Sequence, residues 1–169
     1  CEFNTRSKDF ILVTIHRSEH VDNPQILDQI LEAILKISRD NKVIVSLHPR
    51  TASKLDMNKY KDITNLKICK PFNFEDFIMF EKHARMILTD SGTVQEEACI
   101  LGTPCLVIRN STERQETIDC GASILTGTDY YNILNGYKRF DEINKNSETF
   151  VWNTPLDYLK ENVSDTVIN

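Results

Sequence analysis

Leu88-Thr-Asp-Ser-Gly-Thr-Val-Gln-Glu-Glu-Ala-Cys-Ile-Leu-Gly-Thr-Pro104 is the stretch that decides the fold of this 169-residue chain. The apolar residues 86–88 predict a short buried strand, and the small polar residues 89–92 predict a tight turn. A helical pattern begins at once, until Gly102 ends it and Pro104 prevents its restart. A strand, a glycine turn and a helix N-terminus together present unpaired N–H groups and the positive end of a helix dipole, which is a place to hold a phosphate.

Two interpretations of this turn stay open. Thr93 and Glu96 have the spacing of a capping box, so the stretch can also be an ordinary capped helix of an α/β domain. Acidic residues such as Glu96 and Glu97 are favoured in a first helical turn without any ligand, because of the helix dipole. If a diphosphate does bind here, two adjacent carboxylates would repel it, so at least one of them should point at hydroxyl groups instead.

The alternation of strand and helix extends outward along the chain. Buried-type strands are predicted at residues 9–16, 42–48, 65–69, 85–89, 104–108 and 123–125. Helices are predicted at residues 24–37, 51–60, 74–82, 93–101, 114–119 and 129–143. The helix at 24–37 is the best defined, because Asn23 can cap it and Pro24 can take its first position.

This order of elements predicts an α/β fold, a Rossmann-like doubly wound parallel sheet with right-handed crossovers. We expect a single domain over residues 1–169, a length that can bury its own core. Residues 146–169 form a tail without a clear place in the sheet. The tail contains the only tryptophan, Trp152, and ends in a marginal helix from about Pro155. Such tails often pack on another domain.

Composition excludes several functional classes. The net charge of −5 argues against non-specific binding to nucleic acid, which needs a basic face. No apolar run approaches the roughly 20 residues of a membrane span, and no segment resembles a signal peptide. The five cysteines form no C-x-x-C pair, and their odd number does not suit a disulfide framework, so we expect buried thiols. We therefore expect a cytoplasmic protein without a membrane or nucleic-acid partner.

Ligands of doubly wound sheets bind at the carboxyl ends of the strands, so the polar residues that follow each strand are the candidates. They are His16, Arg17 and Glu19; His48 and Arg50; Phe72 and residues 74–77; Asp90, Ser91 and Gly92; and Arg109, Ser111, Thr112, Glu113 and Arg114. By type they suit a sugar nucleotide or a phosphate, because arginine forks and helix N–H groups bind phosphate and a carboxylate can accept from two ribose hydroxyls.

Each candidate also has a plain alternative. A histidine at a strand end, such as His16 or His48, can merely satisfy a backbone carbonyl, and a lone arginine can be a solvated loop charge. His16 and His20 are four residues apart, but they lie on a predicted loop and not in an H-E-x-x-H helix, so no metal site is predicted.

Four segments together resemble one known family, the non-hydrolysing UDP-N-acetylglucosamine 2-epimerases, in motif, order and spacing. They are Thr14-Ile-His-Arg-x-Glu19, Leu47-His-Pro49, Thr89-Asp-Ser-Gly-Thr-Val-Gln-Glu-Glu97 and Arg109-x-Ser-Thr-Glu-Arg114. The resemblance covers residues 9–127 and also Asn162-Val-Ser164 in the tail. It is to the C-terminal half of the family only, and it implies the C-terminal domain of a two-domain GT-B-type fold with the active site between the domains.

The resemblance implies an enzyme that inverts C2 of UDP-N-acetylglucosamine to give UDP-N-acetylmannosamine for surface polysaccharide. The route is anti elimination of UDP to a 2-acetamidoglucal and re-addition of UDP to the other face, without a redox cofactor or a metal. The implied partners are the UDP-sugar substrate and the N-terminal domain of the same protein, which supplies most acid/base groups, in a full-length homodimer. We therefore expect these 169 residues alone to bind UDP weakly and to turn over nothing.

The resemblance also assigns roles by matching positions. It implies a catalytic histidine at His16, near the diphosphate and the reacting sugar, and the following residues that bind the UDP-sugar: Arg17 and Glu19 in the same motif, His48, Phe77 beside the uridine, Ser91 and Gly92 at the phosphate, Glu97 on the ribose hydroxyls and Arg114 at the diphosphate or sugar.

The chain departs from the common pattern of the family at three positions. Gln115 stands where proline is common, Thr93 where a second glycine is common, and His20 where asparagine is common. These departures concern the choice of sugar more than nucleotide binding. The alternatives are a C2-epimerase of a UDP-2-acetamido-2,6-dideoxyhexose, a hydrolysing relative that releases free sugar, a GT-B glycosyltransferase donor domain and a UDP-sugar-binding module without catalysis.

Overall fold

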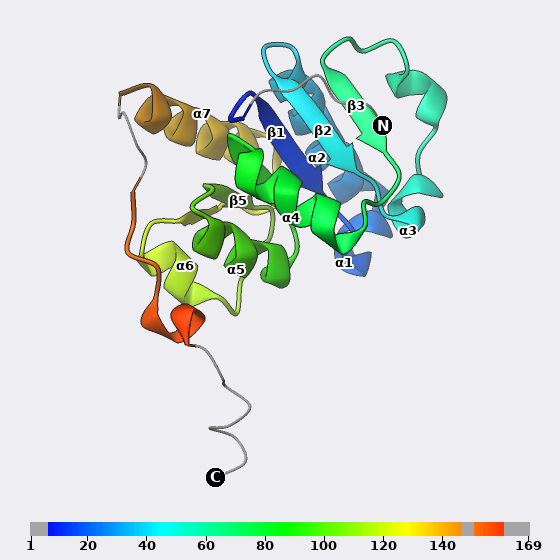
Figure 1. Ribbon diagram of the computed structural model, residues 1–169. Coiled ribbons are helices and arrows are strands. Elements are labelled where there is room, and N and C mark those ends of the chain that lie inside the picture. Colours follow the sequence, from blue (N-terminus) through cyan, green and yellow to red (C-terminus); the bar gives the residue numbers. More distant parts are fainter. Residues whose placement is uncertain (1–6, 147–150, 161–169) are drawn as a thin grey trace.

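Six parallel strands form one sheet in the order β3-β2-β1-β4-β5-β6 (Figure 1). The computed structural model describes residues 7–146 and 151–160. The strands are β1 Phe10–Thr14, β2 Lys42–Ser46, β3 Leu66–Cys69, β4 Met86–Thr89, β5 Cys105–Val107 and β6 Ser123–Leu125. The prediction of a doubly wound parallel sheet is therefore confirmed, and each strand lies within or close to its predicted range.

Helices cover both faces of this sheet (Figure 1). They are α1 Ser18–Val21, α2 Pro24–Ser38, α3 Pro49–Ala52, α4 Phe74–His83, α5 Gly92–Leu101, α6 Gln115–Asp119 and α7 Tyr130–Asn146, with short 3-10 turns η1 Met57–Tyr60 and η2 Leu156–Leu159. Buried side chains of α2 and α7 pack on one face of the sheet, and those of α4 and α5 pack on the other.

Strand β1 shows why both faces are buried. All five of its residues are buried, and successive side chains point to opposite faces. Ile11 and Val13 belong to the core on the α2 side, and Phe10 and Leu12 to the core on the α4 side. A strand covered on both faces needs a continuous apolar sequence, which is what residues 10–13 provide.

The ends of the helices follow local rules. Asn23 caps α2, its side chain accepting from the N–H groups of Gln25 and Ile26, and Pro24 takes the first turn as predicted. Gly102 ends α5 with φ 73°, a left-handed conformation that suits glycine.

Three local predictions need correction. The cap of α5 is Ser91, which accepts from the N–H of Val94, and not Thr93, because the helix begins at Gly92. The predicted helix at 51–60 is two short pieces, α3 and η1. The predicted loop after β1 contains the one-turn helix α1, whose buried Val21 packs inward.

The described part of the tail lies against α5. Trp152 Nε1 donates to the carbonyl oxygen of Cys99 at 3.1 Å, and η2 contacts α5. The marginal helix expected from Pro155 is a 3-10 turn in its described part. The Asn162-Val-Ser164 motif lies outside the described residues, and packing of the tail on another domain stays a prediction.

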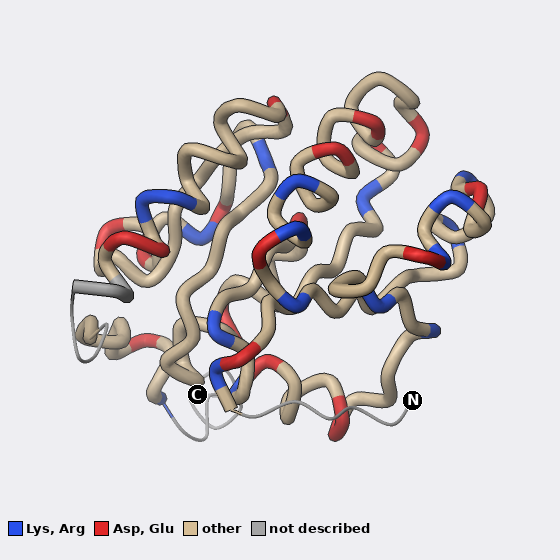
Figure 2. The backbone as a smooth tube through the Cα atoms, turned by 90° about the horizontal axis from the view of Figure 1, so that it is seen from above, with Lys and Arg blue, Asp and Glu red and all other residues tan. Residues whose placement is uncertain are grey.

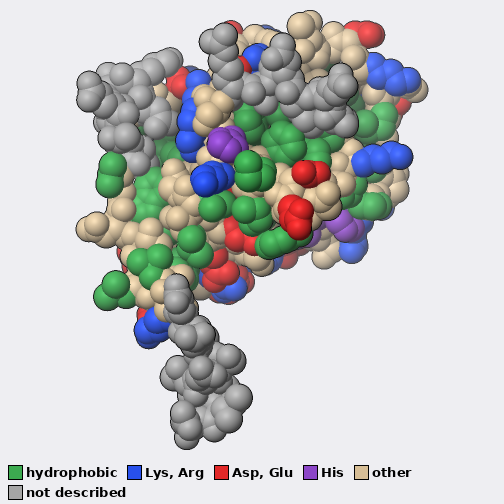
Figure 3. Space-filling view, viewed as in Figure 1, with side chains coloured by type: hydrophobic (Ala, Val, Ile, Leu, Met, Phe, Trp, Pro, Cys, Tyr) green, Lys and Arg blue, Asp and Glu red, His purple; other side chains and the backbone are tan. Residues whose placement is uncertain are grey.

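Lysine and arginine positions are interspersed with aspartate and glutamate positions along the backbone drawn in Figure 2. Hydrophobic side chains gather over α4 and α5 on the face seen in Figure 3, and Phe74, Met79 and Ile100 are exposed there. Within residues 7–146 and 151–160, no helix is long and apolar enough to cross a membrane.

Candidate functional site

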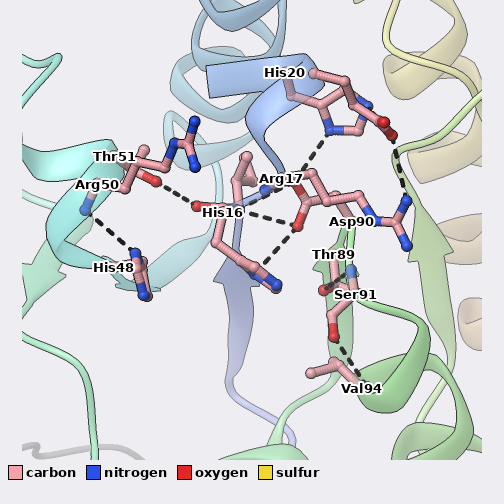
Figure 4. A network of polar contacts seen from close by, with 12 residues as sticks. His16, Arg17, His20, His48, Arg50, Thr51, Thr89, Asp90, Ser91 and Val94 are labelled. Atoms are coloured by element: carbon pink, nitrogen blue, oxygen red, sulfur yellow. Dashed lines mark hydrogen bonds and ion pairs between the residues drawn. The ribbon is translucent and has the colours of Figure 1, made fainter. Parts of the chain in front are cut away.

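The strand order places a reversal of direction between β1 and β4, where the chain winds outward to both edges of the sheet. In doubly wound sheets, ligands bind at such a switch point, outside the carboxyl ends of the strands. The loops that follow β1 and β4 meet at this point through Asp90, the first residue after β4 (Figure 4). The loop after β2 joins them, since Thr51 Oγ1 donates to the carbonyl of Ile15 at 2.6 Å.

Asp90 is the hub of these loops. Its side chain is fully buried and accepts the backbone N–H of His16 at 3.1 Å and that of Arg17 at 2.9 Å. It also accepts from His20 Nδ1 at 3.0 Å, because an ionised carboxylate can only accept. Burial by itself raises the pKa of Asp90, but the hydrogen bonds from His20 and Arg17 and the contacts with His16 outweigh burial and hold the pKa below its ordinary value.

Two histidine rings lie side by side next to this hub. The ring centres of His16 and His48 are 6.1 Å apart. His16 Nδ1 is 3.4 Å from Asp90 Oδ1, which leaves Nε2 on the opposite side of a ring that is 41% exposed. His48 Nδ1 accepts the backbone N–H of Arg50 at 3.2 Å, so its proton is on Nε2. Among residues 7–146 and 151–160, no hydrogen bond or ion pair involves Nε2 of either ring, so both Nε2 atoms are available to a ligand.

The first turn of α5 forms the second part of the site. Ser91 takes the N–H of Val94, so the N–H groups of Gly92 and Thr93 are the ones without an intrahelical acceptor. A Cβ atom at Gly92 would lie 4.0 Å from Cγ and from Cζ of Arg114, which places this guanidinium beside the turn. Arg114 also forms an ion pair with Glu96, so one of the two neighbouring carboxylates is neutralised.

A buried glutamine, which the sequence analysis did not single out, connects these parts of the site. Gln95 is fully buried in α5 and donates to the carbonyl of Arg114 at 3.2 Å and to Thr117 Oγ1 at 2.5 Å. Its side-chain oxygen accepts from Thr112 at 2.7 Å. Gln95 thus holds the loop after β5 against α5 and keeps Arg114 in place.

Several candidate charges are already paired within the chain. Arg109 is buried and bonds Glu113 through both terminal nitrogens, at 2.9 and 2.8 Å, and this hydrogen bonding lowers the pKa of Glu113 to about 2. Arg50 pairs with Asp22. These two arginines hold loops, and we infer no ligand contact for them.

Arg17 and Glu19, both predicted to bind the UDP-sugar, lie close to each other. Arg17 Nη1 is 3.4 Å from Glu19 Oε1; the Arg17 side chain is partly exposed, and that of Glu19 is exposed. Glu19 is also 3.7 Å from Nε2 of the buried His20. The sequence pattern did not select His20, although its place in the Arg-x-Glu-His run was a usable signal.

Phe77 lies in α4 and Glu97 in α5, two helices that pack on each other. Phe77 is half-buried and packs on the core of that face. Glu97 is half-buried; burial raises its pKa, and the neighbouring Glu81 carboxyl of α4 opposes that rise. In the part of the chain that the structure describes, no group of three or more His, Cys, Asp and Glu side chains could hold a metal ion.

Comparison with known proteins identifies relatives of this chain. The family model described as UDP-N-acetylglucosamine 2-epimerase matches residues 2–169. A UDP-N-acetylglucosamine 2-epimerase of Methanococcus maripaludis is 40% identical over 158 residues, which are 90% of this chain and 42% of that protein. A UDP-2,3-diacetamido-2,3-dideoxy-D-glucuronate 2-epimerase of Pseudomonas aeruginosa is 37% identical over 70% of this chain and 33% of its own length.

Solved structures agree with the fold. The UDP-GlcNAc 2-epimerase of Methanocaldococcus jannaschii, in complex with UDP-GlcNAc and UDP, superposes with a TM-score of 0.80 at 41% identity over 90% of this chain and 42% of that chain. An E. coli heptosyltransferase, WaaC, shares the fold alone, with a TM-score of 0.58 at 12% identity over 83% of this chain and 45% of its own. The sheet therefore matches one domain of GT-B-like proteins, and this chain spans less than half the length of these relatives.

Proposed function

Since this chain belongs to the UDP-N-acetylglucosamine 2-epimerase family, we propose that it is the UDP-binding, C-terminal half of an enzyme that inverts C2 of UDP-N-acetylglucosamine. The observation that carries the proposal is the first turn of α5, where Arg114 lies beside Gly92. Free N–H groups, a helix dipole and a guanidinium converge there, which suits the two phosphates of UDP.

In the proposed reaction, the bond from C1 to UDP breaks while C2 loses a proton, giving a 2-acetamidoglucal. UDP then adds back to C1 while C2 receives a proton on the other face, so no electrons are gained or lost overall. This chain holds UDP through the intermediate, with Glu97 on the ribose and His16 Nε2 near the diphosphate and the reacting sugar. The N-terminal domain of the same protein supplies further acid/base groups and excludes water.

The substrate has a second candidate. The Pseudomonas relative is similar to this chain at 37% identity and is named for a different UDP-amino sugar. Substrates of the family thus vary, and the alternative that we propose is a C2-epimerase of a UDP-2-acetamido-2,6-dideoxyhexose; rates with purified UDP-sugars distinguish the two. We propose in either case a cytoplasmic homodimer that supplies sugars for surface polysaccharide. The likeness to the heptosyltransferase is one of fold and supports no sugar transfer.

Glu97→Ala tests the UDP site directly in this chain. Both ribose hydroxyls would lose a charged acceptor, so UDP binding should weaken by about 1.5–3 kcal/mol. The exposed Glu32→Ala on α2 is the matched control and should bind as the parent does. Unchanged affinity in Glu97→Ala, measured by titration, would remove Glu97 from the site.

Catalysis is tested separately from binding. We expect no epimerisation by the 169 residues alone, and measurable turnover would contradict the need for a second domain. In the complete protein, His16→Ala should lower turnover more than UDP affinity, and a full-rate variant would leave His16 a structural role.

A further inference from the structure

Glu81 is a buried acid on α4, the helix that packs on α5. Its side chain lies in α4 and is fully buried, although it is a carboxyl group. Neither carboxyl oxygen receives a hydrogen bond from an N–H or O–H donor of the described residues. Only the backbone carbonyl of Glu81 is bonded in this way, by Thr103 Oγ1 at 2.8 Å. Such a group is costly to bury when it is charged.

The group that faces Glu81 is another carboxyl, that of Glu97 on α5. Two neighbouring carboxyl groups can hydrogen-bond each other only when one of them carries a proton. Burial, first, and the neighbouring Glu97, second, raise the pKa of Glu81 to about 9. Glu97 accepts the bond, which opposes the rise that its own burial causes in its pKa. Glu81 is the fully buried member of the pair and has no N–H or O–H donor among the described residues, so it is the carboxyl that burial keeps neutral.

The other charged or titratable groups around this pair leave the assignment unchanged. The Lys8 ammonium donates to the carbonyls of Lys82 and Ala84 and to Thr103 Oγ1, at 3.0 to 3.2 Å, and not to a carboxylate. Burial raises the pKa of the Cys105 thiol, so it stays neutral. Glu96 is next to Glu97 but pairs with Arg114. No cation of the described residues is therefore found on the Glu81–Glu97 pair.

We propose that Glu81 is a positioning residue for nucleotide recognition: its protonated carboxyl donates to the Glu97 carboxylate and orients it for the ribose hydroxyls of UDP. This inference rests on the proposed function, in which Glu97 accepts from the ribose. The bond from Glu81 uses one lone pair of the Glu97 carboxylate, and the remaining lone pairs can accept from the ribose hydroxyls. A free glutamate would have to order its side chain on binding, and the bond from Glu81 removes that cost.

The proposal gives Glu81 an effect on UDP affinity that depends on pH. As the pH rises through the raised pKa of about 9, Glu81 loses its proton, and two carboxylates then repel each other. Glu97 is displaced, and the affinity for UDP falls. Glu81→Gln keeps a donor that does not titrate, and Glu81→Met keeps the volume but removes the donor.

The experiment measures binding of UDP and of 2′,3′-dideoxyuridine diphosphate, which lacks both ribose hydroxyls, to the 169-residue chain. NMR shifts follow the weak binding from neutral to alkaline pH, and the exposed Glu75→Gln of α4 is the control. Uracil also loses a proton in this range, so the measured quantity is the ratio of parent to Glu81→Gln affinity at each pH. Carbon-13 shifts of the glutamate carboxyls report the protonation of Glu81 in the same samples.

We expect Glu81→Met to weaken UDP binding about three- to tenfold at neutral pH, the loss of one hydrogen bond, and to leave the dideoxy analogue unaffected. The parent should lose UDP affinity at least about fivefold relative to Glu81→Gln as the pH rises beyond the pKa of Glu81. Equal pH profiles of parent and Glu81→Gln, or unchanged UDP binding by Glu81→Met, would overturn the inference while the proposed function stands. If the parent binds no UDP at all, the proposed function fails, and this inference fails with it.

Discussion

Asp90 and Glu81 are both fully buried carboxyl groups of the same domain, yet the pKa of one is lowered and that of the other is raised. Asp90 accepts two backbone N–H groups and a bond from His20, and its pKa lies below the ordinary value. Glu81 has no such donors and faces another acid, and its pKa is raised to about 9. The difference shows that burial alone does not decide ionisation. The donors that the fold brings to the carboxyl decide it.

Asp90→Asn tests whether the donors around Asp90 need an ionised acceptor, and it should have the largest effect. The amide has the same shape, but its NH2 group cannot accept a hydrogen bond. At least one of the buried donors around Asp90 would lose its acceptor, so the free energy of unfolding should fall by about 3–5 kcal/mol. Urea denaturation measures the loss. Asp40→Asn, at an exposed position just after α2, is the control and should change little. A loss below about 1 kcal/mol for Asp90→Asn would show that the hub is not held as described.

His20→Phe removes one donor from Asp90 and keeps a ring in the buried space. A hydrogen bond to a charged group is worth about 1.5–3 kcal/mol, and we expect a destabilisation of that size near neutral pH. Because the pKa of Asp90 is depressed, its contribution is present above the unfolded value of 3.8 and is lost as the pH falls through the folded pKa. The difference between parent and variant should therefore shrink in acid. His83→Phe is the control, and a pH-independent difference would contradict the prediction.

Glu81→Met tests the charge state of Glu81. Its effect on the free energy of unfolding should be smaller than that of Asp90→Asn and of opposite sign. Replacing a buried acid by an apolar side chain of similar volume should stabilise the fold by about 1–2 kcal/mol near neutral pH. The pKa of Glu81 rises from 4.5 to about 9 on folding, so its contribution is full below 4.5 and is lost as the pH rises through about 9. The gain should grow towards alkaline pH, as measured by Tm. A constant gain, or an equal gain in the exposed Glu75→Met, would refute the assignment.

The sequence predicted the fold well because its signals are local. A continuous apolar run is enough to predict β1, and Asn23 with Pro24 is enough to start α2. The gathering of His16, Asp90 and Arg114 at one edge also followed, because all parallel strands end on the same side. The starting residue of α5 was wrong because Ser91 and Thr93 are both good caps, and local sequence does not choose between them.

The two buried acids required tertiary information. The bond from His20 to Asp90 joins segments far apart in the chain, and no spacing predicts it. A signal for Glu81 was present but unused: it lies one helical turn after Phe77, on the apolar side of an amphipathic helix. Its contact with Glu97 depends on how α4 packs on α5, which the pattern of a single helix does not contain.

The bond from Trp152 to the carbonyl of Cys99 has a practical consequence. Trp152 is the only tryptophan of the chain, so its fluorescence comes from one known position at the contact between the tail and α5. The emission therefore reports whether the tail is seated on the helix that begins at the proposed phosphate turn. The protein carries its own optical label, and release of the tail can be followed in solution without attaching a dye.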